Sequence, residues 1–159
     1  METKHDPARA FLESVREARV TLARCRWKLQ QAKAQCDQIT AQITVSGVSG
    51  HSGDGHKDAR WAALADLRDL LEEQYNRALR AEIEVERFLS RVEDSNQRAV
   101  LRMRYADCLP WTAVQERLQA SGIYYSERQI FRLHGEALQT ARRLHRELYP
   151  EQYEQEGEP

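Results

Sequence analysis

The chain has 159 residues, of which 31% are charged and only 8% aromatic, and its formal net charge is -1 at pH 7. This length suits one domain or a small domain with an extension, and the high charged fraction is typical of long helices whose outer faces lie in water. The three cysteines are odd in number and form no C-x-x-C pair, so neither a disulfide framework nor a zinc knuckle is indicated. Because the chain shows neither a signal peptide nor an apolar run of membrane-spanning length, we expect a soluble cytoplasmic protein without membrane contact.

A first long helix is predicted over residues 7–45. Asp6 and Pro7 form an N-cap followed by proline, at the helical position where the missing N–H costs nothing. Small or apolar residues then recur in alternating steps of four and three, which is a heptad seam. The seam consists of Phe11, Val15, Ala18, Leu22, Cys25, Leu29, Ala32, Cys36, Ile39 and Ile43.

A flexible loop is predicted over residues 46–56. This segment holds four of the seven glycines, and glycine loses the most backbone entropy on entering a helix. His51, Asp54 and His56 have the chemistry of metal ligands, but three ligands on a flexible loop lack a rigid frame and a fourth partner. We therefore predict no metal and no cofactor.

A second long helix is predicted over residues 58–93, and its seam matches the first in length. Two such helices should fold back as an antiparallel, coiled-coil-like hairpin over residues 1–93, because each needs an apolar partner for its stripe. The off-seam residues Leu70, Leu79, Ile83 and Leu89 widen the apolar face, so we expect them to meet the C-terminal domain or a second copy in a homodimer. The second seam consists of Leu64, Leu67, Leu71, Gln74, Ala78, Ala81, Val85, Phe88 and Val92.

A small three-helix domain of the helix-turn-helix type is predicted over residues 94–149. Asp94 and Gln97 have capping-box spacing and begin a helix over about 95–106. After a turn, Pro110 opens a short helix with Val114 and Leu118 inward, and Ser126 with Gln129 caps a last helix that runs to residue 148. Residues 150–159 are rich in glutamate and are predicted to form a disordered acidic tail. The buried stripe of the last helix is expected to be Ile130, Leu133, Ala137, Ala141, Leu144 and Leu148.

The opposite face of this last helix is cationic. Residues 97–148 contain nine arginines, no lysine and five acidic residues, so the positive charge of the chain is C-terminal. The second helix of a helix-turn-helix enters the major groove, where arginine can bond guanine and glutamine can bond adenine through paired hydrogen bonds. We predict base contacts from Arg128, Gln129 and Arg132. The complete predicted DNA-binding set is Ser126, Glu127, Arg128, Gln129, Phe131, Arg132, Gly135 and Gln139.

Several neighbouring residues have two interpretations. Gly135 permits either close approach to a duplex or tight packing against another helix, with equal weight. Arg142, Arg143 and Arg146 are expected on a solvated surface rather than at phosphates, and His134 is expected in a structural role. The large rings Tyr105, Trp111, Tyr124 and Tyr125 are expected in the core, with Tyr124 or Tyr125 as the exception that stacks on a base.

The stretch from Leu101 to Leu138 resembles the C-terminal signature of the phage ArpU-type late transcriptional regulator family, which in turn resembles the promoter-reading region four of sigma-70-type factors. The resemblance implies a helical DNA-binding module of a phage or prophage that acts on late genes with the host RNA polymerase in the bacterial cytoplasm. The turn between Trp111 and Ile130 is several residues longer than the common sigma-type spacing. The matching residues are Arg104, Tyr105, Trp111, Val114, Leu118, Ser126, Arg128, the run from Arg132 to Gly135, and Ala137 with Leu138.

No paired carboxylates, glycine-rich phosphate loop or catalytic Ser/His/Asp order appears on a plausible scaffold, and long helices with a small domain offer no obvious cleft, so we predict that the protein is not an enzyme. We predict a sequence-specific transcription regulator that binds double-stranded DNA with the helix over 126–148 and contacts RNA polymerase or a second subunit through the hairpin. Two alternatives stay open. One is a phage DNA-packaging or recombination accessory protein, and the other is a coiled-coil interaction module without DNA binding.

Overall fold

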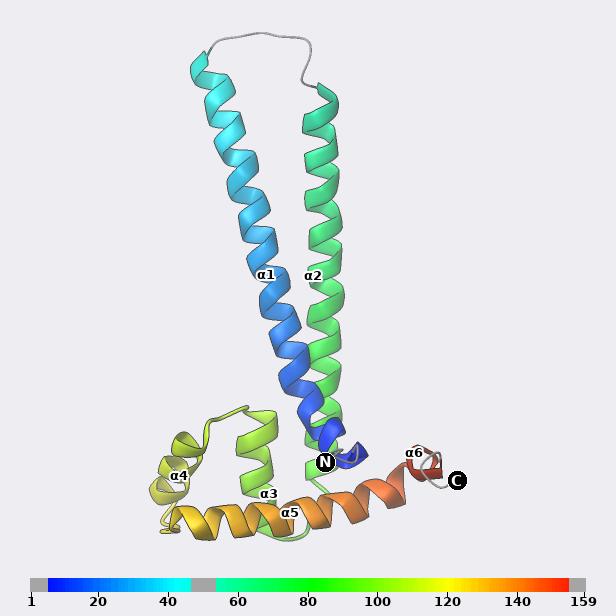
Figure 1. Cartoon of the computed structure of the whole chain (residues 1–159), viewed down its shortest axis with the longest axis vertical. Coiled ribbons are helices and arrows are strands. Elements are labelled where there is room, and N and C mark those ends of the chain that lie inside the picture. The colour runs from blue at the N-terminus through cyan, green and yellow to red at the C-terminus, as the bar shows by residue number, and fades with distance from the viewer. Residues whose placement is uncertain (1–5, 47–53, 155–159) are drawn as a thin grey trace, which may run out of the picture. The chain divides into compact units, whose positions relative to one another are not determined.

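The computed structural model describes residues 6–46 and 54–154, and every regular element in these two ranges is helical (Figure 1). The predicted all-α fold is therefore confirmed. None of the described helices combines the length and the apolarity needed to cross a membrane. The elements are α1 (Pro7–Ser46), α2 (Asp54–Leu89), α3 (Ser95–Leu101), the π-helix η1 (Arg102–Ala106), α4 (Trp111–Ala120), α5 (Glu127–Leu148) and α6 (Glu151–Glu154).

The chain divides into two compact units. One consists of Ala18–Leu79 and contains most of α1 and α2, whereas the other combines the described residues up to Glu17 with those from Arg80 onward. This division does not coincide with the predicted domain boundary after residue 93. The reason is that the first turns of α1 and the last turns of α2 share a core with the helices that follow.

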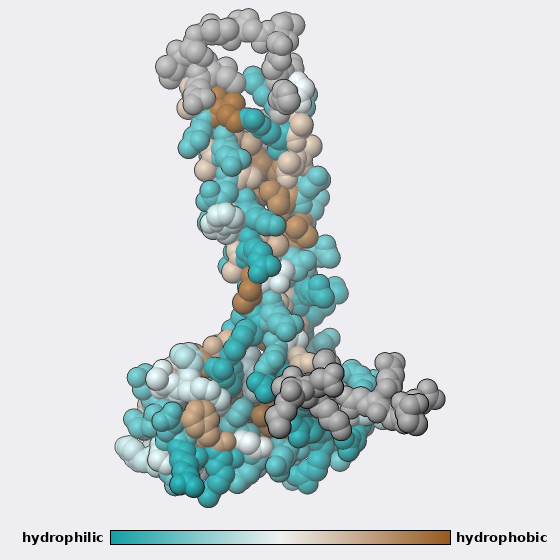
Figure 2. All heavy atoms as spheres, viewed as in Figure 1, coloured by the Kyte–Doolittle hydropathy of each residue, from teal (hydrophilic) through white to brown (hydrophobic). Residues whose placement is uncertain are grey.

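Within the unit formed by Ala18–Leu79, α1 and α2 run antiparallel along the predicted heptad seams. No described seam residue of this unit is exposed, and Cys25, Leu29, Leu64 and Ala78 are buried. The side chain of Ile43 lies outside the described residues. The off-seam Leu70 and Leu79 are exposed, and Figure 2 shows brown hydrophobic patches among teal hydrophilic residues on these long helices.

The ends of the two long helices differ from the prediction. Ser46 belongs to α1, and α2 begins at Asp54, so the predicted loop over 46–56 is wrong at its margins, while residues 47–53 lie outside the described residues. Gly55, which was predicted to lie in the loop, is the second residue of α2. At its other end α2 stops at Leu89 instead of residue 93, and the N–H of Val92 donates to the carbonyl of Leu89 at 3.0 Å in the following turn.

The other unit has an apolar core built from the start of α1, the end of α2, η1 and α5. Leu89, predicted to lie off the seam, is fully buried in this core, and so is Leu12, which the seam omitted. Ala137 and Ala141 supply small side chains on α5, which let the helix approach the others closely. The buried members are Leu12, Val15, Val85, Phe88, Leu89, Val92, Leu101, Tyr105, Ala106, Ala137 and Ala141.

A second cluster holds the helix-turn-helix together. Val100, Val114, Leu118 and Ile130 are buried against one another and join α3, α4 and α5. The predicted helix over 95–106 is confirmed in its bounds, but it is α-helical only to Leu101 and continues to Ala106 as η1. In η1 the N–H of Asp107 donates to the carbonyl of Arg102 at 2.9 Å, which is the wider π pattern. The wider turn contributes Tyr105 and Ala106 to the core.

The predicted disordered tail over 150–159 is wrong for its first residues, since Glu151–Glu154 form α6. Two contacts of Tyr153 account for this order. Its hydroxyl lies 3.0 Å from Nδ1 of His145, and the Arg146 guanidinium lies 4.9 Å from the centre of its ring. Residues 155–159 lie outside the described residues.

Candidate nucleic-acid interface

The start of α5 is fixed by the predicted capping box at Ser126 and Gln129. The Ser126 Oγ accepts a hydrogen bond from the N–H of Gln129 at 3.3 Å, and the Gln129 Oε1 accepts one from the N–H of Ser126 at 2.8 Å. Gly122 ends the preceding helix with a φ of +81°, a conformation that costs glycine little. The turn and the cap together define where α5 begins and which side chains its first turn presents.

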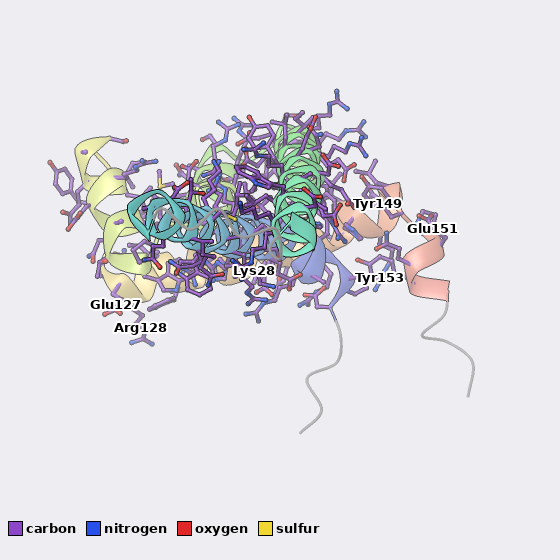
Figure 3. All side chains as sticks on the ribbon, turned by 90° about the horizontal axis from the view of Figure 1, so that it is seen from above. Lys28, Glu127, Arg128, Tyr149, Glu151 and Tyr153 are labelled. Carbon is purple, nitrogen blue, oxygen red and sulfur yellow. The ribbon has the colours of Figure 1, made fainter. Side chains whose placement is uncertain are left out.

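All members of the predicted DNA-binding set are exposed. Figure 3 shows Glu127 and Arg128 projecting from the start of α5 into open space, at the opposite end of the helix from Tyr149 and Tyr153. Among the side chains that the structure describes, no carboxylate lies within ion-pair distance of Arg128. Its guanidinium is therefore free for a partner outside the chain.

Two of the predicted base readers have partners of their own. The Oε1 of Gln129 is engaged by the capping box, also through the Ser126 hydroxyl at 2.9 Å. Paired bonding to adenine needs both the oxygen and the nitrogen of the amide, so the closed box is incompatible with that role of Gln129. Arg132 Nε lies 3.8 Å from Oε1 of Glu136 in an exposed pair, and such pairs contribute little. Arg132 therefore stays available for a base.

Phe131 belongs partly to the α4–α5 contact. Its ring meets Trp111 edge-on with 5.0 Å between centroids, while 43% of the residue remains exposed. Trp111 also contacts His134 at 4.8 Å between ring centroids, and the Arg104 guanidinium lies 4.9 Å from the centre of the Trp111 ring. These contacts brace α4 against α5, which holds the exposed face of α5 in place.

His134 has the structural role expected from the sequence. Its Nε2 lies 3.1 Å from the Tyr105 hydroxyl, and the two rings stack with centroids 5.9 Å apart. Burial, together with the positive charges of Arg104 and Arg9, lowers the pKa of His134 to about 4. The imidazole is neutral at physiological pH and brings no positive charge to a phosphate. Burial also raises the pKa of Tyr105, which keeps its hydroxyl protonated.

Gly135 lies on an open part of α5. A Cβ added there would meet nothing within 4 Å, so the alternative of tight packing against another helix of this chain is wrong. A glycine inside an exposed helix is destabilising relative to alanine. Gly135 thus exposes bare backbone on the cationic face. The remaining interpretation from the sequence is that it permits close approach by an external partner.

The large rings near the turn divide as expected. Tyr105 is buried, Trp111 and Tyr125 are half-buried against the cluster of Val114 and Ile130, and Tyr124 is the exception at 80% exposure. Tyr124 lies in the turn just before the cap of α5. Its ring is the largest exposed apolar surface beside the start of that helix.

The C-terminal half of α5 is tied to the start of α1 by an ion pair. Arg142 donates to Oδ2 of Asp6 from Nε at 3.1 Å and from Nη2 at 2.7 Å. Burial alone raises the pKa of Asp6, but the hydrogen bonds and charge of Arg142, with the N–H groups of Arg9 and Ala8, outweigh it and hold that pKa below its usual value. The Asp6 carbonyl also accepts from the N–H of Ala10 at 2.9 Å, as expected for the predicted N-cap.

His145 was missed by the sequence analysis. It is fully buried among the rings of Phe11, Phe88, Tyr149 and Tyr153, with its Nε2 unpartnered among the described residues. Burial lowers its pKa, although the negative charges of Asp6 and Glu151 act in the opposite direction. Its spacing of four residues from Ala141 was the available signal.

Among the residues that the structure describes, no group of three or more His, Cys, Asp or Glu side chains is placed to bind a metal ion. His51 and the side chains of Asp54 and His56 lie outside the described residues. Cys25, Cys36 and Cys108 are free thiols. The site described above is therefore a surface of α5 and its preceding turn.

The comparison with protein families gives one match. Residues 33–135 match the family described as protein of unknown function (DUF1492), which is well over half of the chain. The chain belongs to this family. No curated protein and no solved structure matches the chain.

The segment shared with the DUF1492 family covers part of α1 and continues through α2, α3, η1 and α4 into α5. It ends at Gly135, so it includes the capped first turns of α5 with Arg128 and Arg132 but not Gln139 or the arginines that follow. Membership of DUF1492 brings no assigned function to these residues.

Proposed function

We propose that this protein is a sequence-specific transcription regulator that reads promoter DNA with α5. The observation that carries the proposal is the start of α5, where a rigid capped helix presents Arg128 to open space without an acidic partner among the described side chains. Arg132 lies one turn further on the same face, and its single exposed ion pair is weak. This is the position from which recognition helices contact base edges in the major groove.

The resemblance of Leu101–Leu138 to the ArpU-type regulators supports a more specific proposal, in which the promoters are those of phage or prophage late genes. The host RNA polymerase, or a second copy of this chain, is then the proposed partner of the long helices. Trp27, Trp61 and Tyr75 in the unit formed by Ala18–Leu79 are 60%, 57% and 50% exposed, and large aromatic side chains are enriched where proteins bind each other.

The same exposed rings favour a second candidate, an interaction module that grips a protein partner and binds no DNA. A phage DNA-packaging or recombination accessory protein is a further alternative that shares the DNA-binding surface. Duplex binding separates the interaction module from the other two, and the location of the bound sites separates a regulator from an accessory protein.

The proposal is tested by measuring binding of the purified protein to duplex fragments that tile a prophage and its promoters. We expect a preferred fragment, with Arg128→Ala and Arg132→Ala each weakening binding to it by about 5-fold to 150-fold, since a paired arginine contact to a base contributes about 1–3 kcal/mol. Arg68→Ala and Arg77→Ala on the exposed surface of α2 are matched controls that should bind normally. A wild-type protein without DNA affinity at low salt would refute the proposal.

A further inference from the structure

The cationic face of α5 extends far beyond its first two turns. At about 3.6 residues per turn, Arg146 lies about five turns after Arg128 and on the same side of the helix. The line from Arg128 to Arg146 carries no acidic residue, but the face is bordered by acids, because Glu136 and Glu147 lie only about 20–40° around the helix from Arg143. The residues of the face are Arg128, Arg132, Gly135, Gln139, Arg142, Arg143 and Arg146.

The length of this face exceeds the width of a groove. At about 1.5 Å per residue, Arg128 to Gly135 spans roughly 10 Å, which fits a major groove about 12 Å wide. Arg143 and Arg146 lie roughly 22 and 27 Å from Arg128 along the same axis. When the start of α5 contacts base edges, these two arginines therefore lie past the rim of the groove, where the surface of DNA is its phosphate backbone.

A polar hollow of about 530 Å³ lies beside these two arginines. Glu136 also lines it, and because its exposed pair with Arg132 at 3.8 Å is weak, it is an acidic side chain that a phosphate in the hollow would meet. The Gln97 Oε1 is buried without a hydrogen-bond partner among the described residues, but this atom is an acceptor and cannot bond a phosphate oxygen, so the arginines would supply the contacts to phosphate. The other lining residues are Gln97 of α3 and Gln139, Thr140, Arg142, Arg143 and Arg146 of α5.

The three arginines of the hollow differ in the partners that they have within the chain. Arg142 donates two hydrogen bonds to Asp6 and so ties α5 to the start of α1. Arg143 has no carboxylate within ion-pair distance among the described side chains, although Glu93, Asp94 and Glu147 line a neighbouring hollow together with it. Arg146 lies over the uncharged ring of Tyr153. We call Arg143 and Arg146 the distal arginines.

We propose that the distal arginines bind the phosphate backbone of the duplex whose bases the start of α5 reads, with the hollow beside Gln97 receiving the sugar-phosphate strand. This inference rests on the proposed function and adds a second, sequence-independent contact to it. The bare backbone of Gly135 lies between the two groups of arginines, where the helix would pass the rim of the groove. Contacts to phosphate fix the register of a protein on DNA without reading its sequence.

The test is the salt dependence of DNA binding by an Arg143→Ala/Arg146→Ala double variant. Each phosphate contact contributes about 0.9 to the slope of log affinity against log salt concentration, so the double variant should lower that slope by about 1.8. The loss should be the same on the preferred duplex and on an unrelated one. Arg143→Lys/Arg146→Lys keeps both charges and should retain most of the slope, and Arg68→Ala/Arg77→Ala is the matched control for loss of two exposed arginines.

An unchanged slope in the alanine double variant would overturn the inference, and it would leave an acidic protein segment as the partner of the hollow. A loss confined to the preferred duplex would overturn it as well, because it would place the distal arginines at bases. Failure of the proposed function looks different: the wild-type protein would show no sequence preference, or Arg128→Ala would have no effect. Circular dichroism of each variant checks that the helices are retained.

Discussion

The neutral state of His134 predicts a loss of stability in mild acid. The folded-state pKa of His134 is about 4, below the ordinary value of 6.5, so the unfolded chain binds more protons between these two values. Stability from this group is full above about pH 6.5 and is lost as the pH falls toward the folded pKa. The pKa of His145 is lowered in the same direction by burial and adds to the effect.

The size of the effect follows from the shift. A histidine with a pKa of 6.5 in the unfolded chain and about 4 in the folded protein lowers the free energy of unfolding by roughly 2 kcal/mol when the pH is reduced from about 7 to about 5. His134 is only half-buried, so screening by water reduces this figure, and we expect about 1 kcal/mol from this residue.

Urea unfolding followed by circular dichroism, repeated at constant ionic strength across this pH range, measures the effect. Glutamine keeps a polar side chain beside the Tyr105 hydroxyl but does not titrate, so His134→Gln should reduce the pH dependence by about 1 kcal/mol. The comparison uses the change with pH in each protein, which separates it from any general destabilisation by the substitution. Identical pH dependence in the wild type and in His134→Gln would refute the reasoning.

Three further predictions concern single residues. Ser126→Ala removes the capping box of α5 and should lower the free energy of unfolding by about 1 kcal/mol. Leu101→Ala leaves a cavity in the core and should lower it by about 2–5 kcal/mol. Both are measured by urea unfolding, and equal losses would contradict the difference in burial between the exposed Ser126 and the buried Leu101. Gly135→Ala meets open space and should raise stability by about 0.5–1 kcal/mol while weakening DNA binding in a fluorescence anisotropy titration. Unchanged DNA affinity in the Gly135 variant would remove that residue from the interface.

The long helices were predictable because the seams repeat over many turns. One slipped position in a heptad pattern would place polar residues inside, and none of the described seam residues is exposed. The unit boundary was not predictable in the same way. Leu12 and Leu89 lie just off the seams, and their burial depends on α5 returning to the start of α1, a contact between residues far apart in sequence.

The start of α5 was also predictable from nearby residues, whereas three features around it were not, for physical reasons. The capping box at Ser126 follows from two residue types at one spacing, but the same box removes Gln129 from base reading, which residue type alone does not reveal. The wide turn of η1 has no simple sequence signature. Helix α6 forms because Tyr153 meets His145 and Arg146, and composition rich in glutamate concealed that contact.

The central proposal, sequence-specific promoter binding by α5, is tested most directly by a genome-wide binding map of the protein in a bacterial host that carries its prophage. We predict enrichment at promoters upstream of late genes, lost in the Arg128→Ala/Arg132→Ala variant and retained in Arg68→Ala/Arg77→Ala. Enrichment at a packaging or recombination site would contradict the assignment to transcription. A map without any enriched site would contradict sequence-specific DNA binding itself.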